Sequence, residues 1–331
     1  MSDEDRALPG MPSHEQLQQA AHWYACLRDG QARASERAAW QTWLAAAEGH
    51  ALAWQQVQEI SRAFEPVRAL PNVREAAEGL QAANQRMRVR RRVLASCALL
   101  TTGGLAGALS WRQGWLPDQV MAWGADAHTH TGELKQMRLA DGSTLWLNTG
   151  SAVDVRFGAS ERRLVLLAGE VFVTTAHDAR PLLVQTTDGQ MRALGTRFNV
   201  QLGNSATELT VFEGAVEVCT TNSGSTLVVA AGQRTRFTRA RIEQPDIADS
   251  ARQAWTQGRL IANNLPLREF VVEMRRYRKG YLGVADAVAD LEVYGSFPAQ
   301  DSDRALKMLS LALPVRIEQR LPWWTSIEAK A

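Results

Sequence analysis

The chain has 331 residues, and its 37 lysines and arginines nearly balance 35 aspartates and glutamates, for a formal net charge of +2. This length is enough for two or three domains, each able to bury a core of its own. The charge is segregated: residues 1–85 carry −4 and contain no lysine, residues 86–92 carry +5, and residues 112–331 carry +1. Because the excess positive charge is confined to seven residues, the sequence argues against a nucleic-acid-binding surface spread over a fold.

The first predicted elements are three short amphipathic helices within residues 13–64, which make the domain at 1–85 a small all-α bundle. The first helix opens on Ser13 with Gln16 three residues later, the spacing of a capping box. In the second and third, apolar residues recur at i, i+3, i+4 and i+7. These are Trp40, Trp43, Leu44 and Ala47, then Trp54, Val57, Ile60 and Phe64, and Pro66 is expected to end the third helix.

The tryptophans of this bundle admit two interpretations. They form its core, or they belong to an apolar face left over after folding, which binds a helical partner. Since the unit is acidic and lacks lysine, the composition favours a protein partner over DNA.

A cluster of arginines borders the longest uncharged run of the chain. As a helix, residues 93–111 span about 28 Å at 1.5 Å per residue, close to the ~30 Å hydrocarbon core of a bilayer. The segment 86–111 therefore predicts one transmembrane helix with the N-terminus in the cytoplasm and the C-terminal two-thirds outside, by the positive-inside rule. The arginines on the cytoplasmic side are Arg86, Arg88, Arg90, Arg91 and Arg92.

Two other interpretations of this run remain open. It is only moderately apolar, as a buried helix of a soluble protein is. Its paired arginines also resemble a twin-arginine export signal, with Ala106-Gly107-Ala108 as a cleavage site. An uncleaved signal-anchor is favoured, because signal peptides are normally N-terminal and this run follows a domain at 1–85.

From about Gly132 the apolar period changes from 3.6 to 2. Asp141-Gly142 and Asp188-Gly189 each lie between alternating strands and predict hairpins with type I′ turns. The stretches "LLAGEVFV", "VFEGAVEV" and "VVAAGQRTRF" each repeat an apolar pair, a glycine and an alternating strand. The region 112–245 is therefore expected to be an all-β domain, and the pattern leaves a sandwich and a solenoid equally open.

Residues 255–331 predict a smaller α+β module. Strand and helix patterns follow one another in the order β-α-β-β-α-β, which is a split βαβ arrangement. Modules of this kind have exposed sheet edges that pair with other proteins.

No polar constellation in the sequence points to turnover catalysis. Cys26, Cys97 and Cys219 lack metal or redox spacing. His128-Thr129-His130 has no carboxylate or cysteine at ligand spacing, so it is interpreted as a loop. Nucleophile-elbow, phosphate-loop and HExxH motifs do not occur in the sequence. We therefore expect no enzymatic turnover, no metal and no cofactor.

The order of these parts resembles the FecR-type family, the transmembrane sensors of bacterial ferric-siderophore signalling. "ERAAWQTWLAAAEGHALAWQQV" resembles the cytoplasmic sigma-regulating segment of that family. "LADGSTLWLNTGSAVDVRF", "LLAGEVFV" and "ALGTRFNV…TELTVFEGAVEV" resemble its periplasmic domain. "ANNLPLREFVVEMRRY" resembles the start of its C-terminal module, which is similar to the secretin-and-TonB N-terminal (STN) fold.

The resemblance implies a single-span regulator in the bacterial inner membrane, with residues 112–331 in the periplasm. An outer-membrane TonB-dependent receptor loaded with an iron chelate would signal to residues 255–331. The cytoplasmic part would control an extracytoplasmic-function (ECF) sigma factor, as an anti-sigma factor or also as an activator. Trp40, Trp43 and Trp54 stand on the family's tryptophan positions and are the expected sigma-factor contacts.

A single helix carries little conformational information, so release by periplasmic and intramembrane proteases is favoured over a piston movement. Gly103, Gly104 and Gly107 would loosen the helix for such a protease.

Some relatives cut themselves at a Gly-Thr bond, and Gly195-Thr196 matches that position. The Thr196 hydroxyl would attack the Gly195 carbonyl and convert the amide to an ester that water opens. Strain in a tight glycine turn would favour this shift. The alternative from the bare sequence is that Gly195 only marks a bulge in a strand.

A different class of protein also fits the membrane anchor: an envelope enzyme or carbohydrate-binding protein with a β-rich outer domain. The tryptophan-rich helical unit argues against it, since an anchor needs no folded domain on the inner side.

Overall fold

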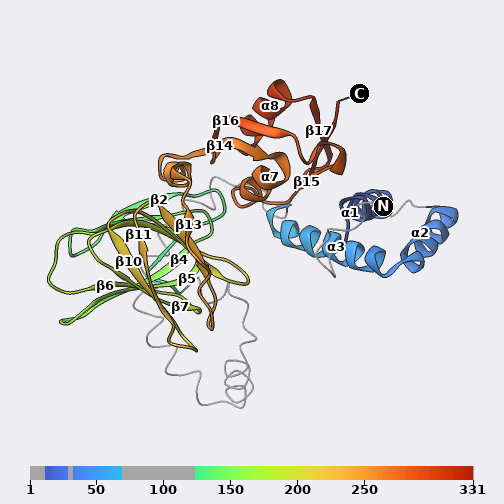
Figure 1. The fold of residues 1–331 in the computed structure, drawn as a ribbon. Helices are drawn as coiled ribbons and strands as arrows, with labels where there is room; N and C mark the ends of the chain where they lie inside the picture. Colours follow the sequence, from blue (N-terminus) through green and yellow to red (C-terminus); the bar gives the residue numbers. More distant parts are fainter. Residues whose placement is uncertain (1–11, 29–32, 69–123, 331) are drawn as a thin grey trace, which may run out of the picture. The chain divides into compact units, whose positions relative to one another are not determined.

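The computed structural model describes residues 12–28, 33–68 and 124–330. The chain divides into two compact units, Met1–Pro117 and Asp118–Ala331, which we describe separately (Figure 1). The predicted arginine cluster and the apolar run at 93–111 lie outside the described residues. Among the helices that are described, none combines the length and the apolarity needed to cross a membrane.

The N-terminal unit contains α1 (His14–Arg28), α2 (Ala34–Ala46) and α3 (Glu48–Arg68). The capping box predicted at the start of α1 is present. The amide of Ser13 donates to Gln16 Oε1 at 2.9 Å, and the amide of Gln16 donates to Ser13 Oγ at 3.2 Å. α3 continues to Arg68, two residues past Pro66, where the sequence predicts its end.

α1 packs along α3, whereas α2 joins the start of α3 and has no buried residue among its described side chains. Among the side chains of this unit that the structure describes, the buried apolar ones belong to α1 and α3, and most are alanines. They are Leu17, Ala20, Ala21, Ala53 and Val57. The helices predicted from the sequence are confirmed, but this small core leaves one of them largely uncovered.

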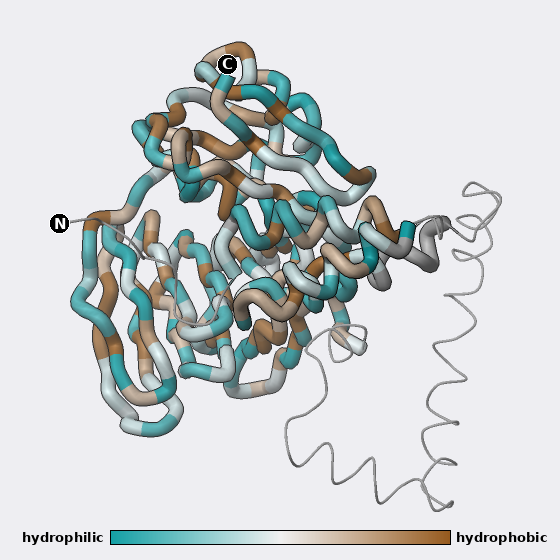
Figure 2. The backbone as a smooth tube through the Cα atoms, turned by 90° about the vertical axis from the view of Figure 1, so that its right-hand side faces the viewer, coloured by the Kyte–Doolittle hydropathy of each residue, from teal (hydrophilic) through white to brown (hydrophobic). Residues whose placement is uncertain are grey.

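The second unit begins with an all-β domain of thirteen hydrogen-bonded strands. Hydrophobic and hydrophilic residues alternate along these strands (Figure 2). The strands are β1 (Ala127–His128), β2 (Lys135–Arg138), β3 (Thr144–Leu147), β4 (Ala152–Phe157), β5 (Arg162–Thr174), β6 (Leu182–Gln185), β7 (Gly189–Ala193), β8 (Arg197–Leu202), β9 (Thr207–Glu213), β10 (Ala215–Thr220), β11 (Thr226–Ala230), β12 (Gln233–Phe237) and β13 (Asp246–Ile247).

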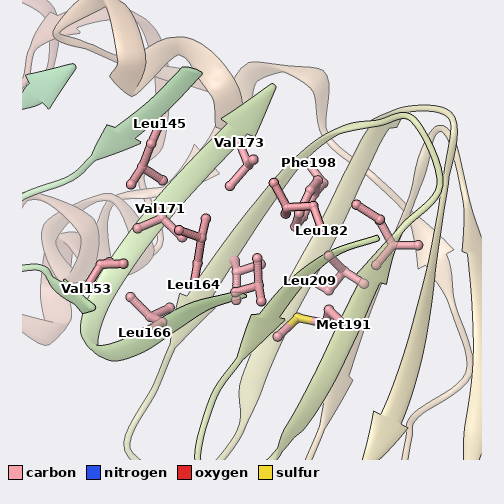
Figure 3. Packing of buried hydrophobic residues seen from close by; sticks show 14 of the residues in the cluster. Leu145, Val153, Leu164, Leu166, Val171, Val173, Leu182, Met191, Phe198 and Leu209 are labelled. Carbon is pink, nitrogen blue, oxygen red and sulfur yellow. The ribbon is translucent and has the colours of Figure 1, made fainter. Parts of the chain in front are cut away.

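The long strand β5 holds the domain together. Its first half pairs with β4 and β6, and its second half pairs with β3 and β8. It changes partners at Gly169, where φ is +81° and a Cβ would clash with Ser151. Both sets of strands enclose one apolar core, which includes Leu145, Leu164, Val171, Met191 and Phe198 (Figure 3). The arrangement is sandwich-like, with β5 shared between its two halves.

Both predicted hairpins exist, but their type I′ turns are wrong. A type I′ turn needs a positive φ at both central residues, and neither Asp141 nor Asp188 has one. The β2–β3 loop instead closes with the amide of Gly142 on the carbonyl of Leu139, and Gly142 has a φ of +85°. The Asp141 carboxylate explains the difference, because it accepts bonds from the amide and hydroxyl of Ser143 at 3.0 and 2.7 Å.

The chain ends in an α+β module that follows a short 3-10 helix, η2 (Ser250–Gln257). Its helices pack on two small sheets, β14–β16 and β15–β18–β17. The predicted order β-α-β-β-α-β lacks one strand, β18, which is buried over most of its length and so shows no alternation. The elements are β14 (Arg259–Pro266), α7 (Leu267–Arg275), β15 (Tyr281–Val284), η3 (Asp286–Val288), β16 (Glu292–Pro298), α8 (Ser302–Ala312), β17 (Val315–Leu321) and β18 (Trp324–Ala329).

Candidate functional site

The Gly195-Thr196 bond lies in the short connection between β7 and β8. Gly195 is exposed and adopts a φ of +73°, a left-handed conformation that favours glycine. Its carbonyl approaches the backbone of Gly214, where an added Cβ would clash with the Gly195 oxygen. Gly214 therefore has to be a glycine for this bond to take its position, and the peptide is held in a tight backbone contact.

The Thr196 side chain is 3% exposed, and its buried hydroxyl has no hydrogen-bond partner in the structure. A buried hydroxyl without a partner costs about 1–3 kcal/mol. The backbone of the same residue is well held. Its amide donates to Thr175 Oγ1 at 2.8 Å, and its carbonyl accepts from the amide of Thr175 at 3.0 Å. The backbone of Thr196, the predicted nucleophile, is thus held by hydrogen bonds, whereas its hydroxyl oxygen makes none.

A hollow of about 230 Å³ opens beside this bond. It is lined by the segment 175–181 after β5 and by residues 192–195 at the end of β7, and it includes the exposed His177. Arg162 forms its buried side and pairs with Asp141 at 2.5 Å. Burial alone would raise the pKa of Asp141, but hydrogen bonds from Ser143 and Arg162 outweigh it and lower that pKa below its ordinary value. Water has access to the Gly195 side of the bond through this hollow.

A buried carboxylate joins the β domain to the C-terminal module. Glu170 of β5 is 3% exposed and accepts bonds from Asn148 Nδ2 and Asn199 Nδ2, each at 2.7 Å. Arg276, which follows α7, donates to it at 2.5 Å. We call Glu170 with Asn148, Asn199 and Arg276 the Glu170 clamp. Burial disfavours the charged Arg276, but the opposing charge of Glu170 outweighs burial and raises the pKa of that guanidinium.

The segment before the module is also docked on the β domain. Trp255 of η2 is buried, and its Nε1 donates to Asn199 Oδ1 at 3.2 Å. Arg252 pairs with Glu208 of β9 at 3.0 Å. These contacts fix the module to β8 and β9, the strands that follow the Gly195-Thr196 bond.

In the N-terminal unit, none of the three tryptophans singled out from the sequence is fully buried. Trp43 stacks on His50 with ring centroids 4.5 Å apart and donates to Gln19 Oε1 at 2.6 Å. Trp40 and Trp54 pack against each other with centroids 5.1 Å apart. Trp43 therefore connects the three helices. Trp40 and Trp54 form a half-open aromatic pair between α2 and α3, and Trp54 also contacts Tyr24 of α1, with ring centroids 6.0 Å apart.

Sequence reasoning missed Glu170, Thr175 and Gly214. A signal existed for two of them, since Glu170 is a lone carboxylate in an apolar strand and Gly214 belongs to a recurrent glycine pattern. Within the ranges that the structure describes, no group of three histidine, cysteine or acidic residues is placed to hold a metal ion.

Comparison with known proteins confirms the resemblance to the FecR-type family. Residues 125–217 match the model of the FecR protein family, and residues 18–60 match a domain of unknown function, DUF4880. No curated protein sequence matches the chain.

Two solved structures have a similar fold. Both are crystal structures of a protein from Parabacteroides distasonis described as a candidate anti-sigma factor, at 2.50 and 1.65 Å resolution. Each is 21% identical to this chain with a TM-score of 0.51, and each covers 62% of it. The matched parts are 98% and 99% of those chains. At this identity the likeness shows a shared fold.

Proposed function

We propose that this chain, which carries a FecR domain behind an N-terminal DUF4880 domain, is an anti-sigma regulator. Its helical unit would bind an ECF sigma factor in the cytoplasm, as an inhibitor or also as an activator. Residues 86–111 would cross the inner membrane, and the β domain with its C-terminal module would lie in the periplasm. Crystal structures of similar fold, from a protein described as a candidate anti-sigma factor, support the anti-sigma part of this proposal.

The observation that carries the proposal is the open helix α2. None of its described side chains is fully buried: Trp40, Trp43 and Leu44 keep part of their surface exposed, although the two tryptophans contact α1 or α3. Partly exposed apolar surface of this kind is available to a helical partner. Trp40 and Trp54 add partly exposed aromatic rings, and tryptophan is among the residues that contribute most to binding at protein interfaces. The net charge of −4 over residues 1–85 favours a partner with a basic surface.

The C-terminal module would receive the signal from a TonB-dependent outer-membrane receptor. Its two-stranded sheet leaves strand edges unpaired, a feature that other proteins commonly use for docking. Large apolar side chains of these strands are exposed, among them Tyr294 of β16 at 69% and Ile261 of β14 at 38%. A receptor domain bound here would act on β5 and β8 through the Glu170 clamp.

Self-cleavage at Gly195-Thr196 would leave the parts of the chain before and after this bond held together by non-covalent contacts alone. Glu170 belongs to the part before the bond, whereas its partners Asn199 and Arg276 belong to the part after it. The two parts also share the six residue pairs of β5–β8 and the five of β7–β10. A cut chain would therefore stay assembled until force on the module separates it, and proteases would then act on the membrane-bound part.

Capture of a sigma factor by the full chain tests the anti-sigma role. Each ECF sigma factor of the source cell is offered in turn to the tagged, detergent-solubilised chain, and we expect one to be retained. Retention of none of them would contradict the proposal.

A denaturing gel tests the self-cleavage. We expect the wild-type chain to split into residues 1–195 and 196–331, Thr196→Ser to split because it keeps a hydroxyl, and Thr196→Ala to stay whole. Splitting of the alanine variant at this bond would rule out the threonine as the nucleophile.

A further inference from the structure

Thr175 makes three contacts with the residue on the C-terminal side of the predicted scissile bond. Its Oγ1 accepts from the amide of Thr196 at 2.8 Å and donates to the carbonyl of Thr196 at 3.2 Å. Its own amide donates to the same carbonyl at 3.0 Å. The nitrogen held by the Thr175 hydroxyl is the nitrogen that leaves when Gly195 and Thr196 separate.

The acyl shift requires a proton at the leaving nitrogen, and this contact places the Thr175 hydroxyl beside that nitrogen. As the Thr196 Oγ1 forms a bond to the Gly195 carbonyl carbon, the bond from that carbon to the Thr196 nitrogen breaks. The attacking hydroxyl loses one proton and the leaving nitrogen gains one, so the shift is an isomerisation with no net change in protons. Hydrolysis then consumes one water and yields the Gly195 carboxylate and the free Thr196 hydroxyl. A group that both accepts and donates a proton beside the nitrogen lowers the barrier to the first step.

A hydroxyl has both capacities. Thr175 also lines the hollow of about 230 Å³ beside Gly195, while its oxygen is bonded to the backbone of Thr196. On the other side the peptide is closed by the backbone of Gly214.

We infer that Thr175 is a catalytic residue of the self-cleavage, whose hydroxyl, bonded to the Thr196 amide in the resting structure, protonates that nitrogen as it departs. The Thr196 hydroxyl has no partner in the resting structure, so the proton that it loses reaches the Thr175 oxygen only as the two oxygens approach each other during the attack. The inference rests on the proposed self-cleavage and names the group that performs its proton transfer. The ground-state contacts give Thr175 a second role, in which the bonds to the Thr196 carbonyl prevent the amide from rotating away from the hydroxyl.

The alternative to proton transfer is that Thr175 only holds the structure of this connection. The bond from its amide extends the β5–β8 ladder by one residue beyond the Thr174–Arg197 pair. A structural role depends on shape and on the backbone, whereas proton transfer depends on the hydroxyl.

The test measures the first-order rate of splitting of freshly synthesised full-length chains on denaturing gels. Thr175→Val keeps the shape and removes the hydroxyl, and we expect it to slow splitting by about 100-fold or more. Thr175→Ser should split within about tenfold of the wild-type rate, as a positioned proton carrier remains. Thr175→Ala should lie between them, because a water molecule fits where the side chain was.

The matched control is Thr174→Val, the same change in the preceding residue of β5, which should leave the rate unchanged. Limited proteolysis of each variant in a Thr196→Ala background reports folding separately from splitting. The pH profile is the second readout. Without the hydroxyl, solvent hydroxide has to remove the proton, so the rate for Thr175→Val should rise more steeply with pH than the wild-type rate.

Several results would overturn the inference. If Thr175→Val splits at the wild-type rate, the Thr175 hydroxyl is not required for cleavage. Equal slowing by the valine and serine changes, with an unaltered pH profile, assigns Thr175 a structural role. If His177→Gln no longer splits while Thr175→Val still does, the proton-transfer role belongs to the His177 imidazole and not to Thr175. A wild-type chain that stays whole removes the self-cleavage itself and this inference with it, but leaves the sigma-factor capture untouched.

Discussion

The N-terminal helices and the β domain differ in how much apolar surface each hides within itself. Over the part of the helical unit that the structure describes, five small or medium apolar residues are buried and none of them belongs to α2. The β domain encloses a continuous core that draws on nearly every strand and includes Phe198 and Phe237. The helical unit thus keeps apolar surface that a partner could cover. The β domain has enough internal contacts to stay folded if the Gly195-Thr196 bond is cut.

The difference follows from the interactions available to each part. Alanines on α1 and α3 allow close packing but contribute little apolar area, so a partner has much to add. In the β domain, central strands such as β5, β8 and β9 pair with neighbours on both sides, and the buried Glu170 and Asn148 side chains are hydrogen-bonded to each other. Changes at the buried ion pairs should therefore have large effects on stability, whereas changes in the helical unit should have small ones.

The largest effect is expected at the pair of Asp141 and Arg162, whose side chains are 0% and 4% exposed. Asp141→Ala leaves a buried guanidinium without its counter-charge, which costs about 3–5 kcal/mol. We expect urea denaturation of the full chain, followed by hydrogen exchange at β2, β3 and β5, to show this loss. An unchanged unfolding midpoint would mean that the β domain does not depend on this pair.

The same pair gives the β domain a dependence on acid. The pKa of Asp141 is lowered from its ordinary value of 3.8 in the folded chain. Its contribution to stability is therefore complete above about pH 4 and is lost as the pH falls through the lowered folded value. Unfolding midpoints measured between pH 3 and pH 7 should fall less for Asp141→Ala than for the wild type, and parallel curves would contradict this.

A smaller effect is expected at the Glu170 clamp, because the Arg276 side chain is 22% exposed. Arg276→Met leaves the Glu170 carboxylate with its two asparagine partners only, at a cost of about 3 kcal/mol. Hydrogen exchange should show faster opening of β8 and of the C-terminal module, and Glu170→Gln in the same chain should recover part of the loss. The matched control is Arg316→Met, which removes an exposed pair with Glu318 and should cost less than about 1 kcal/mol.

The smallest effect is expected at the capping box of α1. Ser13→Ala removes the side-chain acceptor of the Gln16 amide and should cost about 1 kcal/mol. Circular dichroism of the helical unit during heating measures it, with Ser13→Asp as the variant that keeps a capping oxygen. Because this unit depends on few contacts, a loss much above this value would mean that it is more cooperative than its small core indicates.

Much of the architecture was predictable because it depends on local pattern. The three helices, the hairpins and the helix–strand order of the C-terminal module follow from apolar spacing and Asp-Gly turns. The turn types were not, because the carboxylate of Asp141 bonds to Ser143 and to the distant Arg162. β18 was missed because it is buried over most of its length and alternates in neither hydropathy nor size.

The residues of the candidate site likewise include some that were identified from the sequence and some that only the structure reveals. Gly195 and Thr196 were identified through a family resemblance, and the structure adds the left-handed glycine and the unpartnered hydroxyl. Thr175 lies 21 residues away along the chain and approaches Thr196 only when β5 and β8 pair. Contacts that depend on strand pairing over such distances leave no mark in local sequence pattern.

The central claim is that the half-open aromatic pair of Trp40 and Trp54 serves a partner rather than a core. The most direct measurement is the affinity of the Trp40→Ala chain for the captured sigma factor, together with the unfolding midpoint of its helical unit. We predict at least a tenfold loss of affinity with a midpoint shift no larger than that of Ser13→Ala. Unchanged affinity with a collapsed midpoint would show that the pair is a core, and would contradict the account.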